Sequence, residues 1–233
     1  MAPPRLLAIA PEGWHADRDF ARQLIAFRHA TEPLGSSVAV YLRAHGWTTA
    51  QWLQRLAALA RPTELRIGIT LPIDAQLPEE SEQLSDAGVD FVHLTERDAD
   101  RPMEAWRPLH LSRVCHDPRD ARRRLLLGAD WLVVSPIFAT PSKADAVPLG
   151  SAGLAQATDA APGRVVALGG ITPDNAATCL ATGAVGIAVQ RTAWSNAATL
   201  TRSLQPLDGT PLLDDDSSAE SARSLPARDG LAV

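Results

Sequence analysis

The chain has 233 residues, of which 45% are hydrophobic, and this is enough to bury the core of one domain the size of an α/β barrel. Its net charge of −5 argues against sequence-independent nucleic-acid binding, and no apolar run approaches the ~18 residues of a membrane span. The amino terminus lacks a signal-peptide core, and Cys115 and Cys179 lie far apart without metal-ligand spacing, so we expect a cytoplasmic protein.

The first half of the chain alternates short apolar runs with amphipathic segments. Each apolar run ends at Pro, Gly or a polar cluster, which predicts a buried strand, and the amphipathic segments predict helices. The expected strands are residues 6–10, 38–42, 66–70 and 89–94, and the expected helices are residues 17–29, a segment from Thr48 or Thr49 to Leu59, and a weak helix over 79–87.

The second half repeats this alternation more regularly. Asp117-Pro118 is typical of a helix start, because the carboxylate accepts free amide groups and proline at the first helical position needs no N–H. Gly88, Gly128 and Gly183 each stand between an expected helix and a strand, where the left-handed conformation reverses the chain. Strands are expected over 109–115, 131–134, 164–168 and 185–189, and helices over 117–127, 151–160, 172–183 and 193–204.

Eight apolar strands that alternate with helices indicate a parallel sheet of the α/β class. The continuous hydrophobicity of the strands fits burial on both faces. We therefore predict a (β/α)8 TIM barrel that forms a single domain over residues 1–206, with an open doubly wound sheet as the alternative. Residues 207–233 contain the run Asp214-Asp215-Asp216 and too few apolar residues for a core, which predicts a disordered acidic C-terminal tail.

In a TIM barrel, functional residues gather at the carboxyl ends of the strands. The loop after the sixth expected strand offers hydroxyls and the only lysine of the chain, and a glycine pair follows the seventh strand. Such groups suit a phosphate, because cations, hydroxyls and closely approaching main-chain amides all bind anions; an ordinary surface loop is the alternative. The candidate phosphate-binding residues are Thr140, Ser142, Lys143, Gly169, Gly170 and Arg191.

Four segments carry a resemblance to a known family: GADW at 128–131, SPIFATPSK at 135–143, ALGGITPDNA at 167–176 and TGAVGIAV at 182–189. Over residues 89–189 the chain resembles the thiamine phosphate synthase/TenI family. The resemblance implies a (β/α)8 barrel that binds a small phosphorylated heterocycle. Synthase members couple a pyrimidine diphosphate to a thiazole phosphate with Mg²⁺, and TenI members tautomerise a thiazole carboxylate phosphate. The resemblance leaves a homodimer open.

The resemblance assigns roles to individual residues. It implies phosphate contacts by Thr140, Ser142 and Lys143, and binding of the thiazole phosphate by Gly169 and Gly170. In the segment after the second strand, this chain has the family's phosphate-binding arginine but a histidine where the family has lysine. After the fourth strand, the resemblance implies a magnesium ligand. These three positions are Arg43, His45 and Asp98.

The departures from the family pattern favour one activity. Where synthases carry Asn-Asp-Arg, with a second carboxylate for Mg²⁺, this chain reads Thr70-Leu71-Pro72, although expelling diphosphate requires concentrated positive charge. Tautomerisation needs only a group that removes a proton and one that returns it, and imidazole suits both steps. The TenI histidine after the sixth strand is replaced by Ser135, so His116 and His45 are the candidate catalytic residues.

We therefore expect a divergent family enzyme that binds a phosphorylated thiazole and performs tautomerase-like acid–base chemistry. Two alternatives stay open. The first is a Mg²⁺-dependent thiamine phosphate synthase with rearranged metal ligands. The second is a non-catalytic protein that binds a thiamine-related phosphate.

Overall fold

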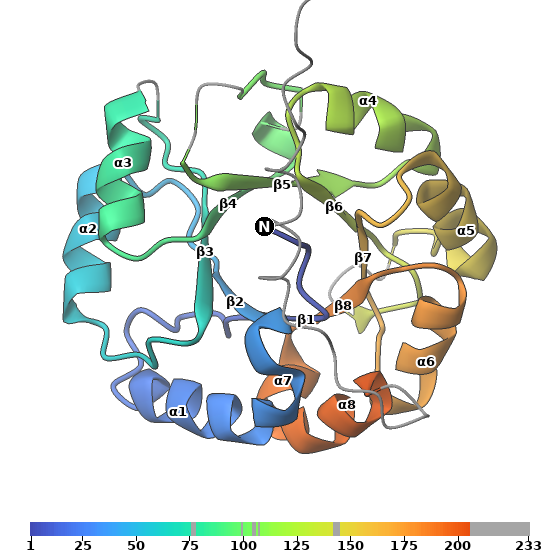
Figure 1. Ribbon diagram of the computed structural model, residues 1–233, viewed down its shortest axis with the longest axis horizontal. Coiled ribbons are helices and arrows are strands. Elements are labelled where there is room, and N and C mark those ends of the chain that lie inside the picture. Colours follow the sequence, from blue (N-terminus) through green and yellow to red (C-terminus); the bar gives the residue numbers. More distant parts are fainter. Residues whose placement is uncertain (76–77, 99, 104–105, 107, 142–144, 206–233) are drawn as a thin grey trace, which may run out of the picture.

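The computed structural model describes residues 1–75, 78–98, 100–103, 106, 108–141 and 145–205. Eight parallel strands form a closed barrel in which neighbours in the chain are neighbours in the sheet and β1 pairs with β8 (Figure 1). The predicted TIM barrel is confirmed. The strands are β1 (Leu6–Ile9), β2 (Val38–Leu42), β3 (Arg66–Thr70), β4 (Phe91–Leu94), β5 (His110–Cys115), β6 (Trp131–Val134), β7 (Val165–Leu168) and β8 (Gly186–Val189).

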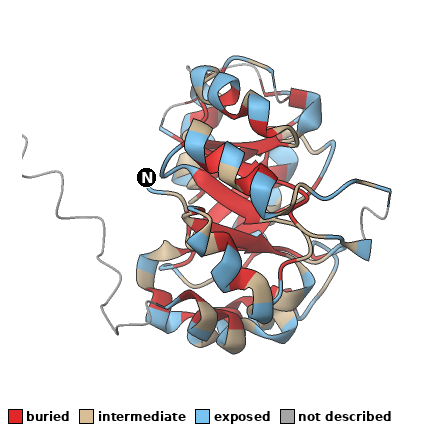
Figure 2. Cartoon of the chain, turned by 90° about the vertical axis from the view of Figure 1, so that its right-hand side faces the viewer, coloured by how far each residue is buried: buried red, intermediate tan, exposed pale blue. Residues whose placement is uncertain are grey.

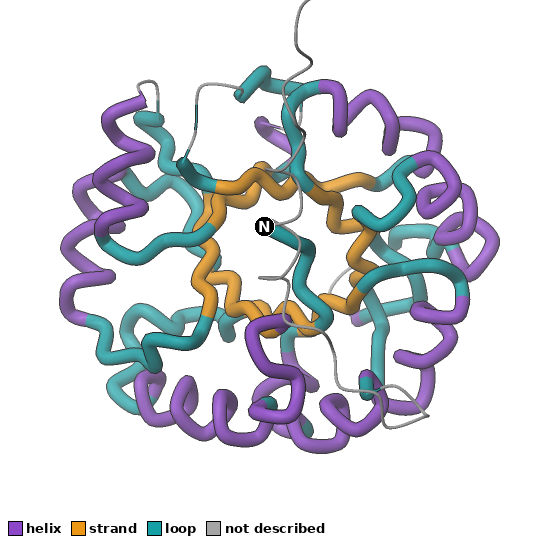
Figure 3. Tube along the Cα trace, viewed as in Figure 1, coloured by secondary structure: helices purple, strands orange, loops and turns teal. Residues whose placement is uncertain are grey.

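Helices surround the ring of strands, as the nested rings of Figure 3 show. The α-helices are α1 (Phe20–Ala30), α2 (Thr49–Ala58), α3 (Pro78–Asp86), α4 (Ala121–Leu126), α5 (Gly150–Ala160), α6 (Pro173–Ala181), α7 (Arg191–Ser195) and α8 (Ala197–Leu204). Short 3₁₀ helices cover Glu32–Ser37, Glu96–Asp98 and Pro118–Asp120. Within the described part of the chain, none of these helices has the length and apolar character needed to span a membrane.

Two expected helices differ from the structure in detail. The segment 193–204 is broken into α7 and α8 at Asn196, whose φ of −144° and ψ of 30° are not helical. The helix expected from Asp117 begins with a 3₁₀ turn, in which the Asp117 carboxylate accepts the amide of Arg119 at 3.0 Å. The expected tail over 207–233 lies outside the described residues.

Both faces of the strands are buried, which Figure 2 shows as a continuous red band through the molecule. A large apolar core fills the space between the strands and the helices, and a second one fills the inside of the barrel. The inner core takes inward-facing residues of six of the strands, because successive side chains of a strand point to opposite faces. Its members are Leu7, Ile9, Ala39, Tyr41, Phe91, Trp131, Val133, Val166 and Ala188.

Candidate functional site

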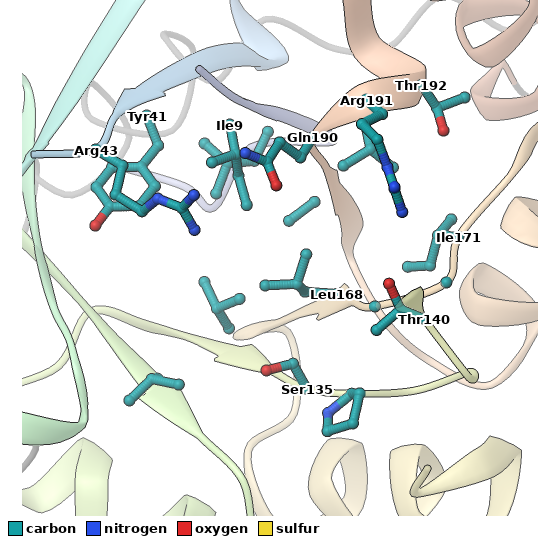
Figure 4. Close-up of a pocket in the computed structure, with 18 of the residues that line it drawn as sticks. Ile9, Tyr41, Arg43, Ser135, Thr140, Leu168, Ile171, Gln190, Arg191 and Thr192 are labelled. Atoms are coloured by element: carbon teal, nitrogen blue, oxygen red, sulfur yellow. The ribbon is translucent and has the colours of Figure 1, made fainter. Parts of the chain in front are cut away.

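A cavity of about 770 Å³ opens at the carboxyl ends of the strands. Its wall is made by the last inward-facing residues of the strands and by the loops that follow them; Figure 4 shows part of it. The predicted residues that line this cavity are Arg43, His45, His116, Thr140, Gly169, Gly170 and Arg191. Ser142 and Lys143 lie outside the described residues. The barrel thus brings the described phosphate-binding and catalytic candidates to one place, and their roles stay predictions.

The glycine pair forms a turn that only glycine fits. Gly169 and Gly170 have φ of 105° and 64°, in the left-handed region. A Cβ atom on Gly169 would lie 2.8 Å from the Cα of Pro136, and one on Gly170 would lie 2.5 Å from the carbonyl oxygen of Ala139. The amide of Phe138 donates to the carbonyl of Gly169 at 2.9 Å, so the loop after β6 is hydrogen-bonded to the glycine turn and helps to fix its position.

The turn leads directly into α6, whose N-cap residue Thr172 also lines the cavity. Thr172 and Asn175 form a capping box, which fixes the start of this helix. The positive end of the α6 dipole therefore lies beside the glycine turn. This arrangement suits a phosphate group held by main-chain amides at a helix start.

Two arginines reach the cavity from different strand ends. Figure 4 shows the guanidinium groups of Arg43 and Arg191 pointing inward, Arg191 from the side where Thr140 and Ile171 lie and Arg43 from the other side. The backbone carbonyl of Arg43 accepts the indole N–H of Trp14 at 3.0 Å, which fixes the segment after β2. Cations on both sides of the cavity favour an anionic ligand.

His116 is held with a defined ring orientation. Its Nδ1 lies 2.6 Å from the carbonyl oxygen of Ser135 and 3.3 Å from the Ser135 hydroxyl. Because a carbonyl oxygen only accepts hydrogen bonds, Nδ1 carries the proton and Nε2 carries the lone pair. His116 therefore lines the cavity in the tautomer whose Nε2 can take up a proton.

His93 stands at the expected end of the fourth strand, where no catalytic or binding role was predicted for it, and it also lines the cavity. Nδ1 of His93 lies 2.9 Å from the hydroxyl oxygen of Ser112, and its ring meets the ring of Tyr41 edge-on at a centroid distance of 4.9 Å. Tyr41 in turn shares a hydrogen bond of 2.9 Å with the hydroxyl of Thr70. These four residues stand on the neighbouring strands β2 to β5 and form what we name the polar arc of the barrel.

Burial controls the charge of the polar arc. Burial, with smaller contributions from the nearby His45 and His116, lowers the pKa of His93 to about 3. It also raises the pKa of Tyr41 to about 12. Both side chains are therefore neutral near pH 7. The signal that could have identified them is a polar residue at an inward-facing position of an otherwise apolar strand.

Asp98 stands apart from the cavity lining. Its carboxylate forms an ion pair of 2.7 Å with Arg97, and its side chain is 11% exposed. The carboxylate nearest to the missing strand-three ligand in the sequence is Asp74, which a rearranged magnesium site could use. It is also engaged, because it accepts the amide of Thr49 at 2.8 Å and the Thr49 hydroxyl at 3.1 Å, at the start of α2. The described residues contain no group of three His, Cys, Asp or Glu able to hold a metal ion. This donor set does not fit a magnesium site built on Asp98 and Asp74, and the role of Asp98 stays a prediction.

The backbone around Asp98 is fastened to the barrel wall by Arg113, a fully buried residue of β5. Its guanidinium donates to the carbonyl of Asp98 at 3.1 Å, to that of Arg101 at 2.5 Å and to that of Leu127 at 2.8 Å. Burial lowers the pKa of Arg113 to about 10, so it stays charged at neutral pH. The hydrogen bonds of this one guanidinium therefore connect the loop after β4 to the end of α4.

Comparison with known proteins agrees with this geometry. The sequence model of a family described as thiamine monophosphate synthase matches residues 7–193. A thiamine-phosphate synthase of Bordetella avium is 35% identical over 196 residues, which cover 80% of this chain and 86% of that protein. A thiamine-phosphate synthase of Methanoregula boonei is 42% identical over 106 residues, 44% of this chain and 49% of that protein, so the match spans about half of its length.

Solved structures show the same fold. A thiamine phosphate pyrophosphorylase from Pyrococcus furiosus superimposes with a TM-score of 0.63 over 86% of this chain and 95% of that one, at 22% sequence identity.

Proposed function

The chain belongs to the thiamine monophosphate synthase family, and from this premise we propose that it is an enzyme of thiamine biosynthesis that binds a phosphorylated thiazole and moves a proton on it. The substrate's phosphate occupies the side of the cavity formed by the glycine turn, the start of α6 and Arg191. Its ring points toward the inside of the barrel, where Ile9, Val133 and Leu168 offer an apolar surface.

The observation that carries the proposal is the fixed tautomer of His116 in the same cavity as the glycine turn. Nε2 of His116 takes a proton from one atom of the bound ring system, and the same imidazole returns it at a second atom. If His45 returns a proton instead, His45 begins protonated, and afterwards His116 releases its proton to water while His45 takes one up. The reaction needs no oxidant, reductant or second substrate, because the product is a tautomer of the substrate. General acid–base catalysis by a positioned imidazole contributes about 10²–10⁴-fold in rate.

The test compares the two activities directly. Purified protein is given a thiazole carboxylate phosphate tautomer and, separately, a pyrimidine diphosphate with thiazole phosphate, each with and without Mg²⁺. We expect isomerisation of the first substrate without added metal, followed by NMR, and an about 10²-fold or larger loss in His116→Gln. The matched control is His29→Gln, which changes an exposed histidine of α1. Robust Mg²⁺-dependent coupling of the second pair, without isomerisation, would contradict the proposal.

A Mg²⁺-dependent thiamine phosphate synthase is the second candidate. It is favoured by the names of the relatives, among them the Bordetella avium protein that matches over most of both chains. It requires metal ligands other than the pair Asp98 and Asp74, since both carboxylates are engaged by neighbouring residues. Binding of thiazole phosphate without turnover of either substrate set would instead favour a non-catalytic ligand-binding protein.

A further inference from the structure

The floor of the cavity has two chemically different halves. The polar arc on β2 to β5 places Tyr41 and His93 on one side, with Thr70 and Ser112 behind them. The strands β6 to β1 fill the other side with apolar side chains, among them Val133 and Leu168. Because the barrel closes in chain order, β4 with His93 stands across the barrel from β8, which leads into Arg191.

His93 is the group of the polar arc that faces the cavity with an unused polar atom. The side chain is 8% exposed and lines the cavity, and its Nδ1 is bound by Ser112. In the described part of the chain, its Nε2 has no hydrogen-bond partner, yet this atom is not among the enclosed, unsatisfied side-chain atoms. An accessible ring nitrogen is hydrogen-bonded by water when no ligand is bound, and a ligand that displaces this water keeps the bond only if it offers a matching polar atom.

From this placement we infer that His93 recognises the ring of the ligand: its Nε2 forms one hydrogen bond with the nitrogen of a phosphorylated aromatic heterocycle. This inference rests on the proposed function and names the group that selects the ring. A ligand whose phosphate lies at the glycine turn extends its ring across the barrel toward β4. Its faces then contact the apolar half of the floor, and its nitrogen reaches His93.

The tautomer follows from the chemistry of the ring. A thiazole nitrogen carries no hydrogen and accepts, so Nε2 must present its N–H, and the Ser112 hydroxyl then donates to Nδ1. The pKa of His93, lowered to about 3 by burial, keeps the imidazole neutral. A neutral donor does not attract the phosphate group electrostatically, so it distinguishes the ring end of the ligand from the phosphate end.

The experiment uses two substitutions that separate the two nitrogens of the ring. In His93→Asn the side-chain amide takes the place of Nδ1 and keeps the hydrogen bond to Ser112, but it is too short to reach the position of Nε2. In His93→Gln the longer side chain brings its amide to the position of Nε2. Isothermal titration calorimetry measures binding of hydroxyethylthiazole phosphate, of its thiophene analogue without a ring nitrogen, and of inorganic phosphate. His29→Asn, on the surface of α1, is the control for loss of a histidine.

We expect the wild type, the control and His93→Gln to bind the thiazole about fivefold more tightly than the thiophene. We expect His93→Asn to bind both alike, with inorganic phosphate unchanged in every variant. Equal discrimination by His93→Asn and the wild type, or a wild type that binds both rings equally, overturns the inference while leaving the proposed function in place. No binding of hydroxyethylthiazole phosphate by the wild type rejects the proposed function and the inference with it.

Discussion

Replacing Gly170 by alanine tests whether the glycine turn holds the phosphate. The substitution brings a Cβ atom to 2.5 Å from the Ala139 carbonyl and 2.8 Å from the Phe138 Cβ, at a φ of 64°. The left-handed backbone costs about 1–2 kcal/mol for a residue with a Cβ, and overpacking adds about 1–3 kcal/mol. Gly163→Ala is the matched control, because its φ of 70° carries the same backbone strain and no atom lies within 4 Å of the new Cβ.

Thermal unfolding and phosphate binding are measured on both variants. For a domain of this size, each kcal/mol lowers the Tm by about 2–4 °C, so Gly163→Ala should lose less Tm than Gly170→Ala. Because hydrogen bonds to charged groups contribute about 1.5–3 kcal/mol each, displacing one amide of the turn should weaken binding of hydroxyethylthiazole phosphate at least tenfold in Gly170→Ala alone. Equal Tm losses, together with wild-type affinity in Gly170→Ala, would refute the assignment of the turn.

Three further outcomes follow from described contacts. Asp98→Asn should change the rate of isomerisation less than twofold, because its carboxylate pairs with Arg97 outside the cavity lining; complete loss of activity in a Mg²⁺-dependent assay would favour the synthase instead. The pKa of His93 falls from 6.5 to about 3 on folding, so the unfolded chain binds the extra proton and stability is lost as pH falls through this window. Denaturant unfolding should therefore show the wild type losing about 2 kcal/mol more than His93→Gln between pH 7 and pH 5, and parallel losses would contradict this. Gly68→Ala should lower the Tm strongly, since the new Cβ would overlap the Phe91 ring inside the barrel, and an unchanged Tm would show that this ring moves freely.

Much of the fold could be predicted because strand composition and helix-ending glycines are local signals. Strand β8 was expected over 185–189 and is observed over Gly186–Val189, directly after the junction at Gly183. The break between α7 and α8 was missed although asparagine can end a helix, because a single Asn also occurs inside helices. The barrel also brought the glycine turn and the cation Arg191 together, as their places after successive strands require.

The polar side of the barrel interior could not be read from hydrophobicity alone. Residues 89–94 contain two polar residues, Asp90 and His93, and hydrophobicity alone does not tell which of them faces the cavity. The link to Ser112 depends on strand register, which appears only when the sheet closes. For Asp98, the adjacent arginine in the sequence was the available sign that its carboxylate has a local partner.

The buried guanidinium of Arg113 has a consequence for how this family member could change its chemistry. Moving the backbone of Asp98 toward the cavity mouth would take one of three carbonyl acceptors away from a fully buried cation. A lost hydrogen bond to a charged group costs about 1.5–3 kcal/mol, which is a sizeable part of the stability of many domains. The backbone at Asp98 is therefore held from the outer side of β5, and its carboxylate could reach the cavity only by rotation of the side chain away from Arg97.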